Sequence, residues 1–178
     1  MRRIILLTTI AIACVALPKQ AVAQYNNWAF GLRLGEPSGV NIRKYFGQNH
    51  AFDLNIGTYG GLYGTNRSYR SGNYKTFGIS IQGHYLWHTE LFGKDNFRGY
   101  YGFGGQINSR KYFPTSRAGT TDPSEGNISL GGSAVAGLEY FVPDKPYSIF
   151  LEMGLYAEVL PAPLFMGVSS GIGIRFNL

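Results

Sequence analysis

Apolar residues alternate one by one with glycine, small polar or charged residues from residue 27 to the C-terminus. The pattern is clearest over 164–178, where the residues of one parity are Leu164, Met166, Val168, Ile172, Ile174 and Phe176. Side chains of a β-strand point alternately to its two faces, so this segment is predicted to be a strand with one apolar face. It is long enough to cross a bilayer, which takes about 9–11 tilted residues.

The first 23 residues have the organisation of a cleavable secretory signal peptide. A basic start precedes an apolar run over 4–17, and Ala21-Val22-Ala23 forms an A-x-A cleavage signature. A lipoprotein signal around Cys14 is the alternative, although Ala11 stands where a larger aliphatic residue is usual. We therefore expect an exported protein with one mature domain over 24–178.

Removal of the signal peptide changes what the composition implies. The formal charge of +6 falls to +3, because Arg2, Arg3 and Lys19 leave with residues 1–23. The only cysteine leaves as well, so the mature domain has no disulfide, thiol nucleophile or cysteine-bound metal. We expect no cofactor, and no nucleic-acid partner for an exported barrel.

Eight segments of the mature domain carry the alternating pattern. They are 27–35, 39–46, 50–63, 74–88, 97–108, 127–142, 147–160 and 164–178. No apolar run of the mature domain is long enough for a membrane-spanning helix. An even number of strands brings both ends of a bacterial barrel to the same side of the membrane. The prediction is an all-β, eight-stranded antiparallel up-and-down transmembrane β-barrel.

The connections fall into two sets that predict the orientation of this barrel. One set, 47–49, 89–96 and 143–146, is fairly short; the other, 36–38, 65–73, 109–126 and 161–163, contains the two longest. Outer-membrane barrels have short periplasmic turns and longer external loops, so both termini are expected in the periplasm.

Two features of the strands indicate that the apolar face meets lipid. An aromatic residue of the apolar parity recurs at the expected periplasmic end of every strand, as in the aromatic girdle of membrane barrels. These residues are Trp28, Phe46, Phe52, Trp87, Phe97, Tyr140, Tyr147 and Phe176. The opposite face is rich in glycine, which leaves room for long side chains in a narrow lumen.

Those long side chains carry balanced charges. Parity places four basic and four acidic residues on the inner face: Arg33, Arg43, Arg98, Arg175, Asp53, Glu139, Glu152 and Glu158. Buried charges are tolerated only when they are paired, so we expect an ion-pair network inside the barrel.

The expected outer loops hold a third group of residues that suits an anionic ligand. These residues are Arg67, Arg70, Arg110, Lys111 and Arg117. They suit phosphates of lipopolysaccharide or another anionic partner, and an ordinary solvated loop is the alternative.

The C-terminal residues 171–178, Gly-Ile-Gly-Ile-Arg-Phe-Asn-Leu, resemble the assembly signal of outer-membrane proteins, with Leu178 in place of the usual Phe. With this segment the mature chain resembles the small eight-stranded outer-membrane barrels of the OmpA/OmpX type. The resemblance implies a bacterial outer-membrane location, contact with outer-membrane lipid and lipopolysaccharide, and recognition by the outer-membrane assembly machinery. It specifies architecture far better than activity.

The expected function is therefore non-enzymatic: a porin-like barrel of the Gram-negative cell envelope, plugged by its own side chains, with a role in envelope structure or surface interaction. Three alternatives remain open. The chain could be an accessory subunit of a secretion or transport assembly, a lipid A-modifying enzyme using His84, or a soluble ligand-binding barrel of the lipocalin kind. No catalytic or metal-binding set is predicted, because His50, His84 and His88 lie apart on the strands.

Overall fold

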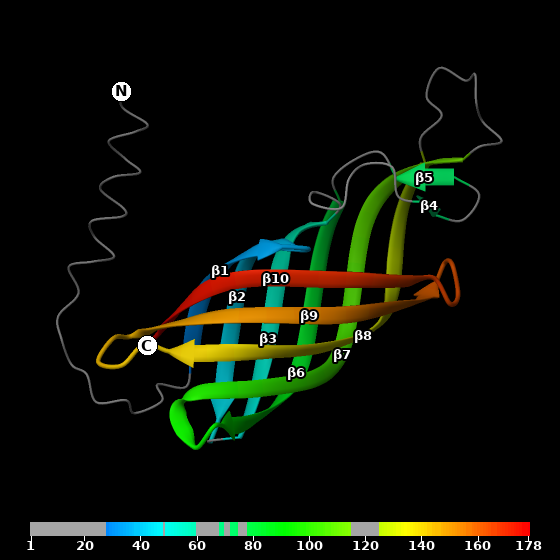
Figure 1. The fold of residues 1–178 in the computed structure, drawn as a ribbon. Coiled ribbons are helices and arrows are strands. Elements are labelled where there is room, and N and C mark those ends of the chain that lie inside the picture. The colour runs from blue at the N-terminus through cyan, green and yellow to red at the C-terminus, as the bar shows by residue number, and fades with distance from the viewer. Residues whose placement is uncertain (1–27, 48, 60–67, 70–71, 75–77, 115–124) are drawn as a thin grey trace, which may run out of the picture.

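The computed structural model describes residues 28–47, 49–59, 68–69, 72–74, 78–114 and 125–178, and it is all-β (Figure 1). Its strands are β1 (Trp28–Gly35), β2 (Ser38–Phe46), β3 (His50–Tyr59), β4 (Ser68–Tyr69), β5 (Gly72–Tyr74), β6 (Gly78–Leu91), β7 (Lys94–Pro114), β8 (Glu125–Phe141), β9 (Tyr147–Leu160) and β10 (Met166–Asn177). The expected signal peptide, 1–23, lies outside the described residues. Within those residues, no helix has the length and apolar character needed to span a bilayer.

Eight of these strands form a closed antiparallel barrel. The sheet runs in the order β6-β3-β2-β1-β10-β9-β8, and β7 pairs with both β6 and β8, which closes the cylinder. The short strands β4 and β5 lie in the connection between β3 and β6, where β5 pairs with the far end of β7. The predicted up-and-down order of eight strands is confirmed.

The connection between β6 and β7 is shorter than predicted. Strand pairing continues to Leu91 and Lys94, so the expected loop over 89–96 reduces to the two residues Phe92 and Gly93. Their φ angles of 59° and 62° are those of a two-residue hairpin turn whose twist matches the flanking strands. The charged residues Glu90, Lys94 and Asp95 interrupt the alternation of apolar and polar residues from which the strand ends were predicted.

The expected loop over 109–126 is also shorter than predicted. Strand β7 continues to Pro114 and β8 begins at Glu125, so pairing extends to Tyr112 and Glu125. The barrel is therefore much taller at β7 and β8 than at the β1–β2 hairpin, which turns at residues 36–37 (Figure 1).

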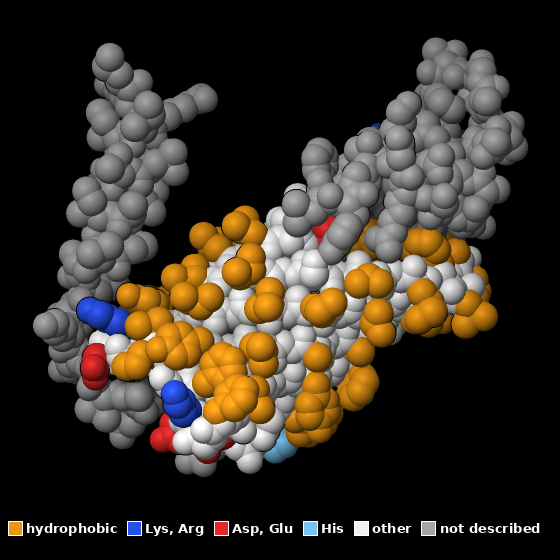
Figure 2. Space-filling view, in the orientation of Figure 1, with side chains coloured by type: hydrophobic (Ala, Val, Ile, Leu, Met, Phe, Trp, Pro, Cys, Tyr) orange, Lys and Arg blue, Asp and Glu red, His pale blue; other side chains and the backbone are white. Residues whose placement is uncertain are grey.

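Burial follows the sequence alternation strand by strand. On β9, Leu151, Met153 and Leu155 are 52%, 63% and 54% exposed, whereas Glu152 and Tyr156 on the other parity are buried. The same outward apolar pattern covers the barrel wall, where hydrophobic side chains lie at the surface in Figure 2. The barrel thus carries most of its large aliphatic residues on its outer face, and the eight predicted lumen charges face in.

Glycines on the inner face accommodate the largest lumen side chains. A Cβ atom at Gly171 would lie 2.6 Å from the Arg33 guanidinium carbon. A Cβ atom at Gly137 would lie 2.5 Å from the Tyr100 ring. These distances are far below normal contact, so each glycine acts by leaving space for a neighbour from the next strand.

This packing predicts different costs for two glycines of the same strand. In Gly137→Ala the new methyl group meets the Tyr100 ring, which should cost about 1–3 kcal/mol of folding free energy. Gly132 faces outward and a Cβ atom there meets nothing within 4 Å, so Gly132→Ala should change stability by less than about 0.5 kcal/mol. Urea titrations of refolded protein compare the two, and equal midpoints would contradict the inward parity of Gly137.

Candidate functional site

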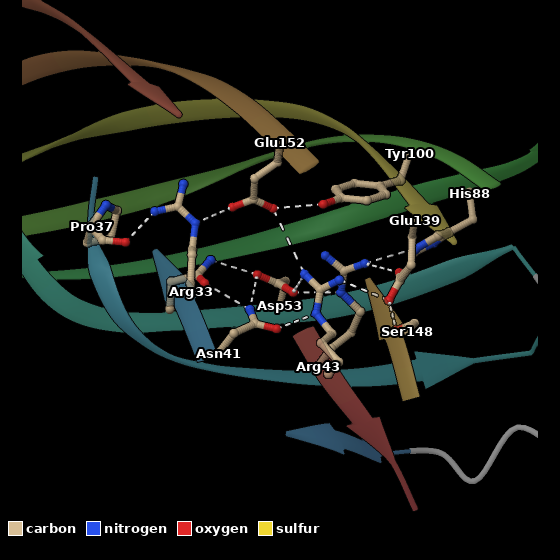
Figure 3. Close-up of polar contacts among 12 residues, drawn as sticks. Arg33, Pro37, Asn41, Arg43, Asp53, His88, Tyr100, Glu139, Ser148 and Glu152 are labelled. Carbon is tan, nitrogen blue, oxygen red and sulfur yellow. Dashed lines mark hydrogen bonds and ion pairs between the residues drawn. The ribbon is translucent and has the colours of Figure 1, made fainter. Parts of the chain in front are cut away.

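The centre of the barrel is a network of buried ion pairs (Figure 3). The Arg43 guanidinium lies 2.6 Å from an Asp53 carboxylate oxygen and 2.8 Å from one of Glu139. Arg175 pairs with the other Glu139 oxygen at 2.9 Å. All four side chains are buried. They come from β2, β3, β8 and β10, and the ion pair between Arg43 on β2 and Glu139 on β8 crosses the lumen.

A second part of the network joins β1, β7 and β9. Arg33 donates to Glu152 at 2.7 Å and also to the carbonyl of Pro37. Tyr100 donates its hydroxyl to the other Glu152 oxygen at 2.8 Å. Arg175 links the two parts, with one nitrogen 3.6 Å from Asp53 and 4.0 Å from Glu152. Three cationic and three anionic groups therefore neutralise one another.

Neutral side chains complete the coordination of the carboxylates. Asn41 and Asn55 donate to the same Asp53 oxygen, at 2.9 and 2.7 Å. Ser148 and Tyr45 donate to Glu139, with Ser148 at 2.6 Å. These bonds compensate for the hydration that the acids lose on burial.

The guanidinium groups also stack on aromatic rings. Arg175 lies 3.5 Å from the centroid of Phe150, and Arg43 lies 4.4 Å from that of Tyr100. His88 of β6 lies 3.4 Å from Arg43 and brings the eighth barrel strand into contact with the network. Every strand of the cylinder therefore contributes a side chain to one connected cluster.

The structure places all eight predicted lumen residues inside the barrel, and six of them form the network described above. Arg98 is directed to the β6–β7 turn, where it donates to the Asp95 carbonyl and lies 3.8 Å from Glu90. Glu158 accepts from the Ala162 amide at 3.1 Å and holds the β9–β10 loop. Strand parity gives the face of each residue but not which residues meet across the lumen.

A second polar layer was not predicted from the sequence. Gln82 donates to Gln106, Gln106 donates to Asn108, and Asn108 donates to Ser129, at 2.8, 2.8 and 3.2 Å. Tyr156 also donates to Ser129. These residues share the inward parity, and that is the signal that could have identified them. They fill another part of the lumen without charge.

His84 has a partner that sequence reasoning missed. Its Nε2 atom lies 2.8 Å from the hydroxyl of Ser133, 49 residues away. In the strand register Gly104 lies between the two, so no side chain separates them. The other ring nitrogen is buried without a hydrogen-bond partner, and the neighbouring Asp53 is bonded to Arg43, Asn41 and Asn55. Within the described residues, the pair thus lacks the acid that orients a catalytic histidine.

The remaining predicted sites fall on the outer wall and the loops. All eight aromatic residues of the expected girdle face outward; Trp28, Phe46, Phe52 and Tyr140 are exposed, and Trp87, Phe97, Tyr147 and Phe176 are half-buried. Of the basic loop residues, Lys111 is exposed on β7. Arg67, Arg70 and Arg117, and the side chain of Arg110, lie outside the described residues. The described part of the chain holds no group of three metal-ligating side chains.

Comparisons with known proteins do not assign the chain to a family. No family model matches the sequence, and no curated protein matches it either.

The network predicts a large difference between two glutamates. Glu139→Gln removes the charge that faces Arg43 and Arg175, so it should lower the free energy of unfolding by about 3–5 kcal/mol. Glu90→Gln at the half-exposed turn should cost at most about 1 kcal/mol. Urea unfolding midpoints of the two variants measure this difference, and similar midpoints would show that the network does not stabilise the barrel.

Proposed function

We propose that the protein is a non-enzymatic β-barrel of a bacterial outer membrane, plugged by its own side chains, with a role in envelope structure or surface interaction. The observation that carries this proposal is the inverted burial pattern. Leu32, Leu34 and Ile128 are 63%, 70% and 70% exposed, although each would gain about 1.5–3 kcal/mol on leaving water. Hydrocarbon around the barrel accounts for this exposure.

The dimensions of the wall support the same proposal. The outward residues of β9 from Ile149 to Val159 are all apolar or alanine. At about 3.3 Å per residue and about 45° of tilt, this stretch is roughly 23 Å tall. Outer-membrane barrels have an apolar band of about 25 Å, bounded by aromatic residues. Tyr147 lies at one end of this stretch, where such a boundary is expected.

The side chains inside the proposed barrel leave no room for a large pore. The charge network and the amide layer occupy the interior with side chains from every strand. An eight-stranded barrel is only wide enough for its own side chains, whereas porins use about 16–18 strands. The protein is therefore proposed to act through its surface and loops, with outer-membrane lipid and lipopolysaccharide as its surroundings. Residues 171–178 would serve recognition by the assembly machinery.

An accessory role in a secretion or transport assembly is the first alternative. The extended β7–β8 hairpin and exposed Lys111 offer a surface for a protein partner at one end of the barrel. Extraction in mild detergent distinguishes the two roles. A partner at constant stoichiometry would favour the assembly, and a lone barrel favours the main proposal.

Membrane integration and pore formation can be tested on one preparation. Refolded into vesicles, the protein should migrate differently on gels before and after boiling, because a closed barrel resists unfolding by detergent. Planar bilayers containing this material should give no stable nanosiemens conductance. Such a conductance would contradict the plugged lumen, and a water-soluble monomer without vesicles would contradict the membrane proposal.

The contact between His84 and Ser133 makes a lipid A-modifying enzyme the second alternative, and a matched pair of proteins tests it. Wild type and His84→Ala should both leave the acyl chains of lipid A unchanged, because the histidine is buried and has no orienting acid in the described part of the chain. Mass spectrometry of lipid A after incubation gives the readout. Modification by wild type alone would establish an enzyme.

A further inference from the structure

One lysine lies on the outward face of the barrel wall among aromatic residues. Lys44 of β2 is directly opposite Trp28 on β1 and Phe52 on β3 in the strand register. Its ammonium group lies 5.0 Å from the ring centroid of Trp28 and 5.4 Å from that of Phe46. Three of the eight girdle aromatics therefore surround this one cation.

A charged residue at an outward position is unusual on this barrel wall. Apart from the β6–β7 turn, where Glu90, Lys94 and Asp95 lie, the other Asp, Glu, Lys or Arg residue at a described outward position of the eight barrel strands is Lys111, toward the far end of β7. In the described part of the chain, Lys44 forms no ion pair with a carboxylate. The ring faces attract the ammonium group but leave its positive charge uncompensated.

We propose that Lys44, with Trp28, Phe46 and Phe52, forms a binding site for the headgroup of an anionic phospholipid in the leaflet on the side of the short turns. This inference rests on the proposed membrane location. In that setting the lysine stem lies along the aromatic wall and the ammonium group reaches the headgroup level. A phosphodiester accepts charge-assisted hydrogen bonds from this group, while the lipid's acyl chains cover the rings.

The charge selects the class of lipid. The phosphate of a zwitterionic lipid is balanced by the lipid's own choline or ethanolamine, whereas the phosphate of an anionic lipid is free to neutralise Lys44. One lysine near an anionic membrane surface corresponds to about a fivefold preference. The site should therefore bind phosphatidylglycerol about fivefold more tightly than phosphatidylcholine, and high salt should weaken this preference.

The chain supplies a reporter and a matched control. It has two tryptophans, Trp28 at the site and Trp87 on β6, and both face outward at the same end of the barrel. Trp87 is surrounded by Tyr85, Tyr101 and Phe103. The Trp87→Phe variant keeps Trp28 as a reporter beside Lys44. The Trp28→Phe variant keeps Trp87 as a reporter away from Lys44.

The experiment measures quenching of each single tryptophan by brominated phosphatidylglycerol and brominated phosphatidylcholine in vesicles. Trp28 should show about a fivefold preference for the anionic lipid, and Trp87 should show none. Lys44→Gln should abolish the preference at Trp28, and Lys44→Arg should retain it. The boiling-dependent gel shift of each variant verifies that it has folded.

The remaining outcomes distinguish failure of the lipid site from failure of the membrane proposal. Equal quenching by both lipids at Trp28, or a preference that persists in Lys44→Gln, would overturn the lipid site and leave the membrane proposal intact. The absence of quenching at both tryptophans in folded protein would overturn the membrane proposal itself, and the lipid site with it.

Discussion

Mutual neutralisation of three guanidinium and three carboxylate groups within a narrow cylinder is the interaction on which the barrel depends. Arg43, Arg175 and Glu139 lie at its centre, each fully buried. Burial of a single unpaired charge costs several kcal/mol, so these groups are compatible with the interior only when all strands have closed. The network therefore ties closure of the cylinder to the strand register, because a one-residue slip would turn its arginines and acids to the outer face.

The same register explains the composition of the wall. Most outward positions carry aliphatic or aromatic residues, whereas inward positions carry glycine, bulky polar residues and a few buried apolar side chains such as Leu86 and Phe150. Glycines leave room for several of the long side chains in the lumen, as Gly171 does for Arg33 and Gly137 for Tyr100. The inward charges, the apolar outer surface and the glycines at close approaches are thus three consequences of one strand geometry. The apolar outer surface supports the proposed membrane location. The inward charges, packed against the glycines, support the proposed plugged lumen.

Much of this architecture could be predicted from the sequence, because a period of two identifies both the strands and their faces. Strand number, strand order and the inward position of all eight lumen charges were predictable for that reason. Which residues meet across the lumen was not, since it depends on shear and closure between distant strands. Parity alone could not separate Arg98, near the β6–β7 turn, from Arg43 at the centre. The contact between His84 and Ser133 was hidden for the same reason, because it requires Gly104 to lie between them in the closed sheet. The β6–β7 turn was missed because its charged flanks interrupt the apolar pattern.

The central claim is that the outward aliphatic face contacts hydrocarbon, and spin labels on β9 test it most directly. The mature domain is expected to have no cysteine, so single cysteines can be placed at Leu151, Met153 and Leu155, with Lys145 in the exposed β8–β9 turn as the aqueous reference. In vesicles, labels at the three strand positions should collide readily with oxygen and rarely with a water-soluble nickel complex, and the label at Lys145 should do the reverse. Strand labels that are as accessible to the nickel complex as the turn label would place the apolar face in water and contradict the account.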